Sequence, residues 1–440
     1  MARFKLSEQG ALALAKTSLH DRIIGCLFGS ALGDAIGLYT EFLSAEVSAK
    51  SYPERRFVLA PPSEATPFRR DSHRGPHEPG EWTDDTDHAL LILLSCLHSN
   101  LGLSSPGDLA SRLHIWVRYG LRALDTLPLG LGRTVGSIVR TKGYLDDPEG
   151  TARQHWTNSK YNAAPNGSLM RTHPLALVCL DKSVDETFQL AADFSVVTHV
   201  DPRCIISCAI GTALVRSLVL HEVCREEDID VLVEQAIAWY AGYRERGLQD
   251  TSRGAEPDLD IAELRRHVRV DGLEVLQLDD SMKLGYVYKT LGSGIHLLRL
   301  AMRSSDATLS SQATIFERLV TNLIMCGGDA DTNACFAGAL VGAYVGYSAL
   351  PTHWRNGLRY GSWLMNKAEG LCQMLGVTEG SYKGSEDKDT APDGGRPMPT
   401  EADMERKVME LQARMAQDGQ RRNERSKEDT EKKSKWFRRK

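Results

Sequence analysis

The sequence predicts an all-α protein with a single large helical domain. Apolar residues recur with the helical period through most of the chain, whereas alternating, strand-like stretches are rare. Of its 440 residues, 42% are hydrophobic and 25% are charged, which is the composition of a protein with a sizeable core. We expect the domain to cover residues 20–378, after an N-terminal extension over 1–19 and before a charged tail over 379–440.

The helical period sets the expected order of elements along the chain. Residues 45–80, rich in Pro, Arg and Ser, predict a loop, and residues 246–280, which are polar and contain Gly, Pro and several Asp, predict an insertion. The tail over 379–440 has few apolar residues, so we expect disorder or a solvated helix there. Helices are expected over 20–38, 86–99, 107–124, 130–141, 186–197, 203–221, 228–244, 283–302, 312–325, 332–346 and 354–375.

Two of these helices carry glycine at every fourth residue. Small residues on one face let two helices approach closely, so we expect both to lie buried at the centre of the domain. The second is uncharged from Thr332 to Thr352, nearly the length of a membrane span, but its glycines and acidic start favour a soluble core. The spaced glycines are Gly25, Gly29, Gly33 and Gly37 in the first, and Gly338, Gly342 and Gly346 in the second.

Two acidic clusters, nearly 250 residues apart, each precede an uncharged apolar run. Unpaired anions beside an apolar core are costly, so the clusters need a counter-ion. Oxygen donors without cysteine favour magnesium, manganese or calcium over zinc or copper, and the number of carboxylates favours two ions bridged by a shared Asp. Either cluster alone would also suit helix capping. The clusters are Trp82-Thr83-Asp84-Asp85-Thr86-Asp87 and Gly327-Gly328-Asp329-Ala330-Asp331-Thr332-Asn333.

Charge and cysteine usage bear on partners and compartment. A net charge of -5 provides no basic field for nucleic acid or an anionic membrane, so we expect neither as a partner. Nine scattered cysteines without a CxxC pair indicate buried thiols in a reducing compartment. We therefore expect a cytoplasmic monomer; the basic end over 432–440 is also compatible with nuclear import, and a mitochondrial signal is the weaker alternative.

Four segments of the chain resemble the ADP-ribosylglycohydrolases, the family of dinitrogenase-reductase-activating glycohydrolase and the eukaryotic ADP-ribosyl hydrolases. Their order and spacing agree with the family over about residues 20–375. The resemblance implies an orthogonal helical bundle and cleavage of the bond at C1 of the distal ribose of ADP-ribose, in an ADP-ribose-bearing protein or an ADP-ribose derivative. The segments are residues 25–37 with Glu41-Phe42, residues 80–86, residues 166–171 and residues 328–332.

The resemblance also assigns residues to roles. It implies two Mg²⁺, with Mn²⁺ as a possible replacement, which would hold the ribose hydroxyls and act as Lewis acids. Glu41 is the expected acid/base and Asp34 an acceptor that orients the ligands. The implied metal ligands are Thr83, Asp84, Asp85, Asp329, Asp331 and Thr332, and the implied substrate-binding residues are Asn166, Gly167, Ser168, Met170 and His199.

One departure concerns the linkage that is cleaved. Some relatives that act on ADP-ribosyl-arginine carry an acidic residue where this chain has Gly130. A guanidinium leaving group benefits from a nearby anion, so we expect O-linked conjugates to be favoured over arginine-linked ones. Two alternatives remain at this stage: a non-catalytic, ADP-ribose-binding or crystallin-like relative, and a di-metal hydrolase of another nucleotide-type substrate.

Overall fold

The structure, a computed structural model, describes residues 7–101, 105–249, 253, 256–304 and 309–437. Within these residues it contains helices and two isolated bridges but no β-strand, which confirms the all-α prediction. The helices are α1 Glu8–Gly37, α2 Ala45–Ser51, α3 Asp84–His98, α4 Pro106–Tyr119, α5 Arg133–Val139, α6 Pro148–Asn158, α7 His173–Leu177, α8 Val184–Ser195, α9 Pro202–Val219, α10 Glu226–Gly247, α11 Ile261–Val268, α12 Val287–Arg303, α13 Leu309–Ile324, α14 Ala330–Val345, α15 Thr352–Arg355, α16 Gly361–Met374 and α17 Glu401–Phe437.

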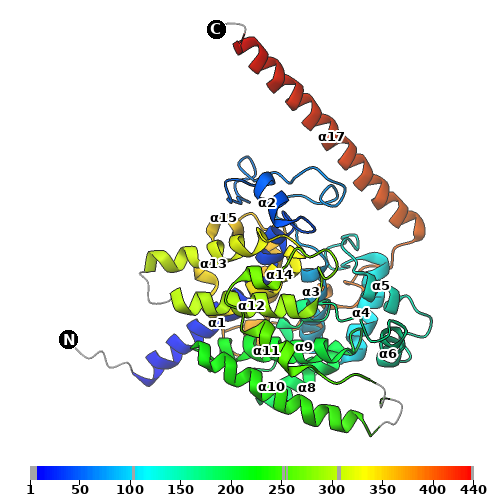
Figure 1. The fold of residues 1–440 in the computed structure, drawn as a ribbon, viewed down its shortest axis with the longest axis vertical. Helices are drawn as coiled ribbons and strands as arrows, with labels where there is room; N and C mark the ends of the chain where they lie inside the picture. Colours follow the sequence, from blue (N-terminus) through cyan, green and yellow to red (C-terminus); the bar gives the residue numbers. More distant parts are fainter. Residues whose placement is uncertain (1–6, 102–104, 250–252, 254–255, 305–308, 438–440) are drawn as a thin grey trace, which may run out of the picture.

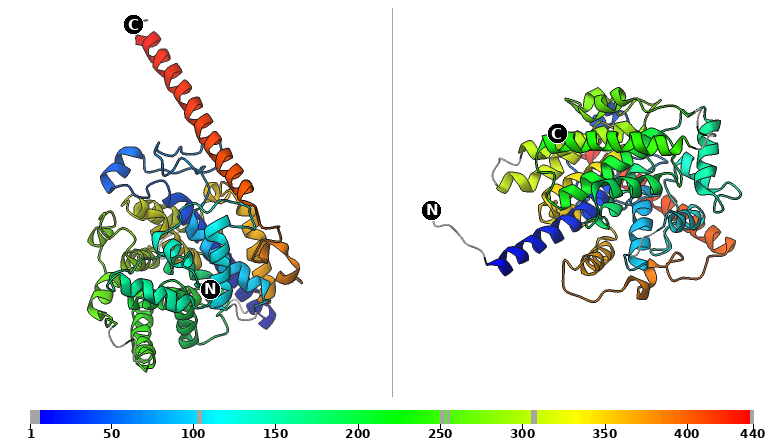
Figure 2. Two further views of the ribbon diagram at one scale, coloured as in Figure 1. Left: turned by 90° about the vertical axis from the view of Figure 1, so that its right-hand side faces the viewer. Right: turned by 90° about the horizontal axis from the view of Figure 1, so that it is seen from below.

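The second half of α1, buried from Ile23 to Gly37, and α14 form the centre of the domain, and the start of α1 projects from it (Figures 1 and 2). They run antiparallel with their backbones in contact through the spaced glycines. A Cβ atom at Gly29 would overlap the carbonyl oxygen of Gly338, and one at Gly33 would overlap that of Ala334. Only glycine permits so close an approach, which explains the four-residue spacing seen in both helices.

The antiparallel contact brings the end of α1 to the start of α14. Gly37 packs against the backbone of Asp331. Beyond α1, the Phe42 amide donates to the Gly328 carbonyl at 2.6 Å, and the Gly328 amide donates to the Leu43 carbonyl at 2.9 Å. Two segments almost 300 residues apart are thereby fixed side by side, and both carry carboxylates.

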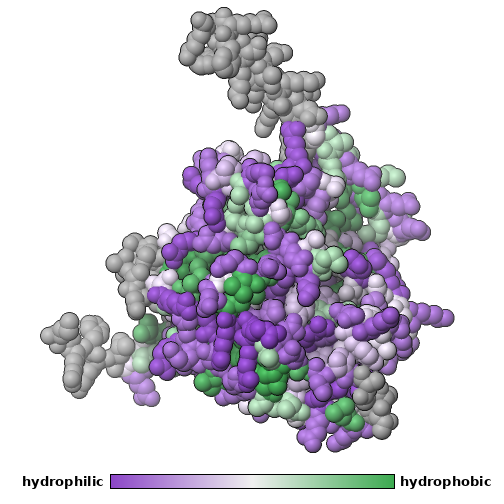
Figure 3. All heavy atoms as spheres, in the orientation of Figure 1, coloured by the Kyte–Doolittle hydropathy of each residue, from purple (hydrophilic) through white to green (hydrophobic). Residues whose placement is uncertain are grey.

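Helix α9 has the length and hydropathy of a membrane span. Of its apolar window, 94% is buried inside the fold, as expected for a core helix. The run from Thr332 that resembles a span in the sequence belongs to α14, whose residues up to Ala343 are all buried. On the face shown in Figure 3, hydrophilic residues predominate and hydrophobic ones form small patches.

Several short elements differ from the expectation. The helix expected over 354–375 is divided into α15 and α16, because Gly357 lies against the backbone of Leu59 in a turn that a continuous helix could not make. The loop over 45–80 begins with α2, and the insertion over 246–280 contains α11, which buries Leu264 and Val268. Helices α6 and α7 were also not expected.

The packed part of the chain extends beyond the expected boundary at residue 378. The Lys367 ammonium pairs with Asp387 at 2.5 Å and with Asp389 at 2.8 Å, and Thr390 is fully buried. These contacts are mostly polar, so a hydrophobic pattern does not reveal them. After this segment α17 projects from the body (Figure 1). At the other end, α1 begins within the expected extension, at Glu8.

The close contact between α1 and α14 predicts that one added methyl group will lower thermal stability. We expect Gly33→Ala to lower the melting temperature, because overpacking against the Ala334 carbonyl costs about 1–3 kcal/mol or more and exceeds the gain of about 1 kcal/mol in helix propensity. Gly107→Ala in α4, where the added Cβ would have no close contact, is the control and should be neutral or stabilising in the same thermal unfolding experiment. Equal melting of Gly33→Ala and wild type would contradict the packing.

Candidate active site

Thr83 places its hydroxyl among several carboxylates at the start of α3. It is the N-cap of that helix, a position that threonine favours because its oxygen accepts a backbone hydrogen bond. The same Oγ1 lies 2.9 Å from Asp34, 3.1 Å from Asp85 and 3.4 Å from Asp331. One hydroxyl proton serves one acceptor at a time, so the carboxylates outnumber this donor.

Asp34, near the end of α1, ties α1 to the start of α3. Its carboxylate accepts from the Thr83 amide at 3.0 Å and from the Thr86 amide and hydroxyl at 3.0 and 2.5 Å. Burial raises the pKa of Asp34 to about 6, although these hydrogen bonds act in the opposite direction. The Asp34 carboxylate thus holds the start of α3 against the end of α1.

The carboxylates gather into two oxygen groups that share one residue. Oxygens of Asp34, Asp85 and Asp331 lie within 4.8 Å of one another, and so do oxygens of Glu41, Asp329 and Asp331. Asp331 therefore stands between the groups. Either group is close enough to place its oxygens around a metal ion.

The electrostatics of these carboxylates fit a divalent cation. Burial raises the pKa of Asp84, Asp85 and Asp331 well above its usual value, and neighbouring carboxylates raise it further. Asp85 Oδ1 is buried without a hydrogen-bond partner. Buried anions without donors are very costly, and the donor set consists of hard oxygens, so a cation such as Mg²⁺ matches the residues present.

Glu41 follows α1 and faces the shared Asp331. Its side chain is only 8% exposed, and one oxygen lies 2.5 Å from His73 Nε2. The Arg74 guanidinium, itself buried, donates to the Glu41 carbonyl. Sequence reasoning predicted a loop bordering the site over 45–80 but did not single out these two residues, because a lone His and Arg in a polar loop carry no distinguishing pattern.

The structure separates the predicted substrate-binding residues into two kinds. His199 lies against Gly167 and, like Gly167 and Met170, lines the same cavity as Glu41; its Nε2 is buried without a partner. Asn166 also lines this cavity, and its side-chain amide donates to Asp329 at 2.8 Å and to Thr290 at 2.9 Å. The Ser168 hydroxyl is turned into the core, where it accepts from Ser195 and Cys208.

The cavity has a volume of about 740 Å³, and its lining includes the carboxylates, Thr332, Tyr286 and Lys283. The Tyr286 hydroxyl donates to Glu263 at 2.8 Å, and Arg203 and Lys283 lie over the Tyr286 ring at 5.6 and 5.8 Å. The Arg203 guanidinium is paired with the buried Asp201 carboxylate at 2.7 Å. Glu263 comes from α11, inside the segment expected to be an insertion.

Gly130 lies beside Asp84 in the lining of the cavity. Its φ of +82° is in the region that glycine favours, and a Cβ there would overlap Asp84 Oδ1. A larger side chain at this position would displace Asp84. The backbone conformation at Gly130 and the closeness of Asp84 therefore both disfavour a residue with a carboxylate side chain at position 130.

The chain belongs to the ADP-ribosylglycohydrolase family, which residues 15–381 match. It is an enzyme of that class, as expected from the sequence. The match ends before the packed segment around Thr390 and before α17.

Named relatives are similar at low identity. The ADP-ribosylarginine hydrolase Tri1 of Serratia proteamaculans is 25% identical over 80% of each chain. The ADP-ribosyl-[dinitrogen reductase] glycohydrolase of Rhodospirillum rubrum is 23% identical over 77% of this chain and 90% of its own, and the ADP-ribosylhydrolase ARH3 of Gallus gallus is 24% identical over 76% and 88%. A solved ADP-ribosylglycohydrolase-related protein complex has the same fold, with a TM-score of 0.51 and 23% identity over 81% of this chain and 99% of its own.

Metal binding should be visible in stability. We expect Mg²⁺ to raise and EDTA to lower the melting temperature of the wild type, because a ligand at 100 times its Kd stabilises by about 2.7 kcal/mol. Asp331→Asn, which removes a carboxylate common to both groups, should abolish the Mg²⁺-dependent shift. Asp181→Asn, at a side chain 84% exposed, should retain it. A wild type that melts identically with Mg²⁺ and with EDTA would refute the metal assignment.

Proposed function

We propose that the chain is a magnesium-dependent hydrolase of ADP-ribose conjugates that favours O-linked over arginine-linked substrates. The observation that carries the proposal is the position of Glu41 in one of the two oxygen groups, which share Asp331 and line a cavity large enough for a nucleotide-sized ligand. Two Mg²⁺, or Mn²⁺ in their place, would be held there by Thr83, Asp84, Asp85, Asp329, Asp331 and Thr332.

The residues of the chain divide the chemistry of glycosidic cleavage between them. The ions, when bound, would supply positive charge that holds the distal ribose and the oxygen of the leaving group. Glu41 is the acid/base group. It lines the cavity, and its carboxylate is oriented by the neighbouring His73, which belongs to neither oxygen group. Asn166 and Asp34 hold Asp329 and the start of α3 in place.

The part of the cavity lined by Tyr286 and Lys283 is the proposed place for the nucleotide part of the substrate. The Tyr286 ring offers an aromatic surface, and Lys283 offers a positive charge for a pyrophosphate. The partnerless Nε2 of His199 is free to bond a polar group of the same ligand. We propose an ADP-ribose-bearing protein or an ADP-ribose derivative as the substrate.

The linkage preference rests on Gly130. A guanidinium leaving group gains from an adjacent anion, and the backbone at position 130 leaves no room for one beside Asp84. An alkoxide leaving group instead needs a proton, which Glu41 is placed to give. Both considerations favour an O-linked conjugate such as ADP-ribosyl-serine.

We predict faster release of ADP-ribose from serine-linked than from arginine-linked conjugates in the presence of Mg²⁺. Glu41→Gln should slow release from the serine-linked substrate by about a hundredfold or more, because it removes the group that transfers the proton, while ADP-ribose binding persists. The rates are measured by chromatography of released ADP-ribose and the binding by calorimetry.

The matched control is Glu46→Gln, five residues along the chain at a side chain 75% exposed, which should leave the rate unchanged. Efficient cleavage of ADP-ribosyl-arginine with serine- and polymer-linked substrates untouched would reverse the linkage assignment. Unchanged turnover by Glu41→Gln would remove Glu41 from the chemistry.

A further inference from the structure

Helix α17 is anchored to the loop that precedes α3. The Arg414 guanidinium donates to the Pro76 carbonyl at 2.6 Å and pairs with Glu78 at 3.1 Å. One residue further along, the end of the Met415 side chain packs against Gly75. These contacts hold residues 71–81, here called the 71–81 loop, from the outer side.

The same helix is tied down a second time, nearer its start. The Lys407 ammonium pairs with the Asp125 carboxylate at 2.6 Å and donates to the Asp125 carbonyl at 3.0 Å. Arg122 in turn donates to the carbonyl of Pro397, just before α17. Two ion pairs about two helical turns apart fix the direction in which the helix crosses the loop.

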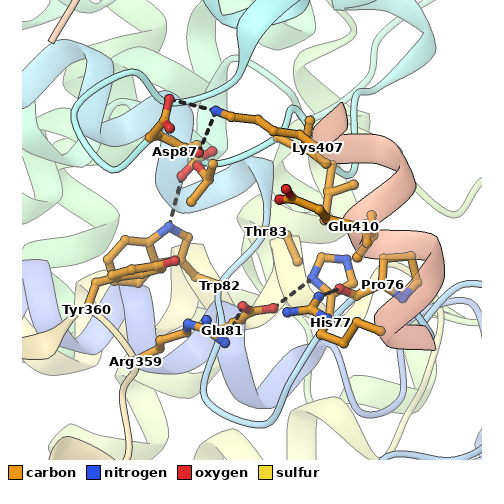
Figure 4. Close-up of a pocket in the computed structure, with 16 residues that line it drawn as sticks. Pro76, His77, Glu81, Trp82, Thr83, Asp87, Arg359, Tyr360, Lys407 and Glu410 are labelled. Carbon is orange, nitrogen blue, oxygen red and sulfur yellow. Dashed lines mark hydrogen bonds and ion pairs between the residues drawn. The ribbon is translucent and has the colours of Figure 1, made fainter. Parts of the chain in front are cut away.

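Between these anchors lies a cavity of about 450 Å³ (Figure 4). Lys407 and Glu410 of α17 line it together with Pro76 and His77 of the 71–81 loop, and Thr83 is also part of its lining. Residues of α17 thus line a space whose lining also includes Thr83, a predicted metal ligand.

The inner side of the 71–81 loop contacts the Glu41 segment. His73 Nε2 lies 2.5 Å from the Glu41 carboxylate, and the His73 ring packs on Phe42 with a centroid distance of 4.8 Å. Arg74 donates to the backbone carbonyls of Glu41 and Tyr39, the latter at 3.0 Å. Only two residues separate Pro76, held by α17, from His73, which holds Glu41.

We propose that α17 is a strap that positions the catalytic carboxylate: Arg414 fixes the 71–81 loop, and His73 and Arg74 pass that constraint to Glu41. The inference rests on the proposed function. Arg414 and His73 are then positioning residues, and α17 contributes to the geometry of the active site. The helix lies beyond residues 15–381, the part of the chain that matches the family.

The test compares kinetics in two pairs of variants. Arg414→Ala and a stop codon after Thr400 should each lower kcat by about tenfold, because a small misplacement of a reacting group is costly, with KM changed by less than about twofold. The matched controls should behave as wild type. They are Arg406→Ala, whose side chain is 65% exposed and pairs only within α17, and a stop after Gly419, which retains every contact named above.

A double-mutant cycle separates positioning from general loss of stability. If Arg414 acts through Glu41, then adding Arg414→Ala to Glu41→Gln should lower kcat no further, whereas a merely structural loss would lower both backgrounds equally. Equal tenfold losses in the two backgrounds, or an unchanged kcat in Arg414→Ala, would overturn the proposal.

Hydrogen exchange provides a readout that needs no activity. The backbone amides of the 71–81 loop should exchange faster in Arg414→Ala than in wild type or Arg406→Ala, because a loop that loses its anchor opens more often. If the wild type showed no hydrolase activity, the proposed function would be wrong, but the comparison of hydrogen-exchange rates would still test the strap. Unchanged exchange in Arg414→Ala would defeat the strap whatever the substrate proves to be.

Discussion

The backbone contact between α1 and α14 is the constraint on which the site depends. Glycines replace side chains where the two helices cross, so the helix axes come close enough for Gly37 to touch Asp331. Because the helices are antiparallel, the end of one and the start of the other meet at the same place. Asp34 lies in α1 and Glu41 just after its end. Asp331 lies in α14 and Asp329 just before its start, so no long loop is needed to bring these carboxylates together.

The crowding of negative charge that results must be offset. Around the carboxylates the fold supplies neutral donors: Thr83 and Thr86 to Asp34, and Asn166 to Asp329. Such donors orient the oxygens but do not cancel their charge, and Asp85 Oδ1 has no donor at all. A metal ion would complete the arrangement, so the same feature that is unfavourable for folding would prepare the protein for its proposed chemistry.

Much of this could be predicted from the sequence because the signals are local and periodic. The glycine spacing of α1 and α14 and the acidic clusters at Thr83 and Asp329 can be read within single segments. His73, Arg74 and Glu263 could not be predicted, since their roles depend on which loop folds over the cavity. The turn at Gly357 and the packed segment near Thr390 were missed because polar and backbone contacts, not apolar stripes, hold them.

We propose that one cluster of buried carboxylates, assembled by the α1–α14 contact, holds two divalent ions that share Asp331. Anomalous diffraction from crystals grown with Mn²⁺ would locate such ions. We expect two peaks, about 3.5–4 Å apart, one near Asp85 and the other near Asp329, with Asp331 between them. A single peak away from Asp331, or no peak among these carboxylates, would contradict it.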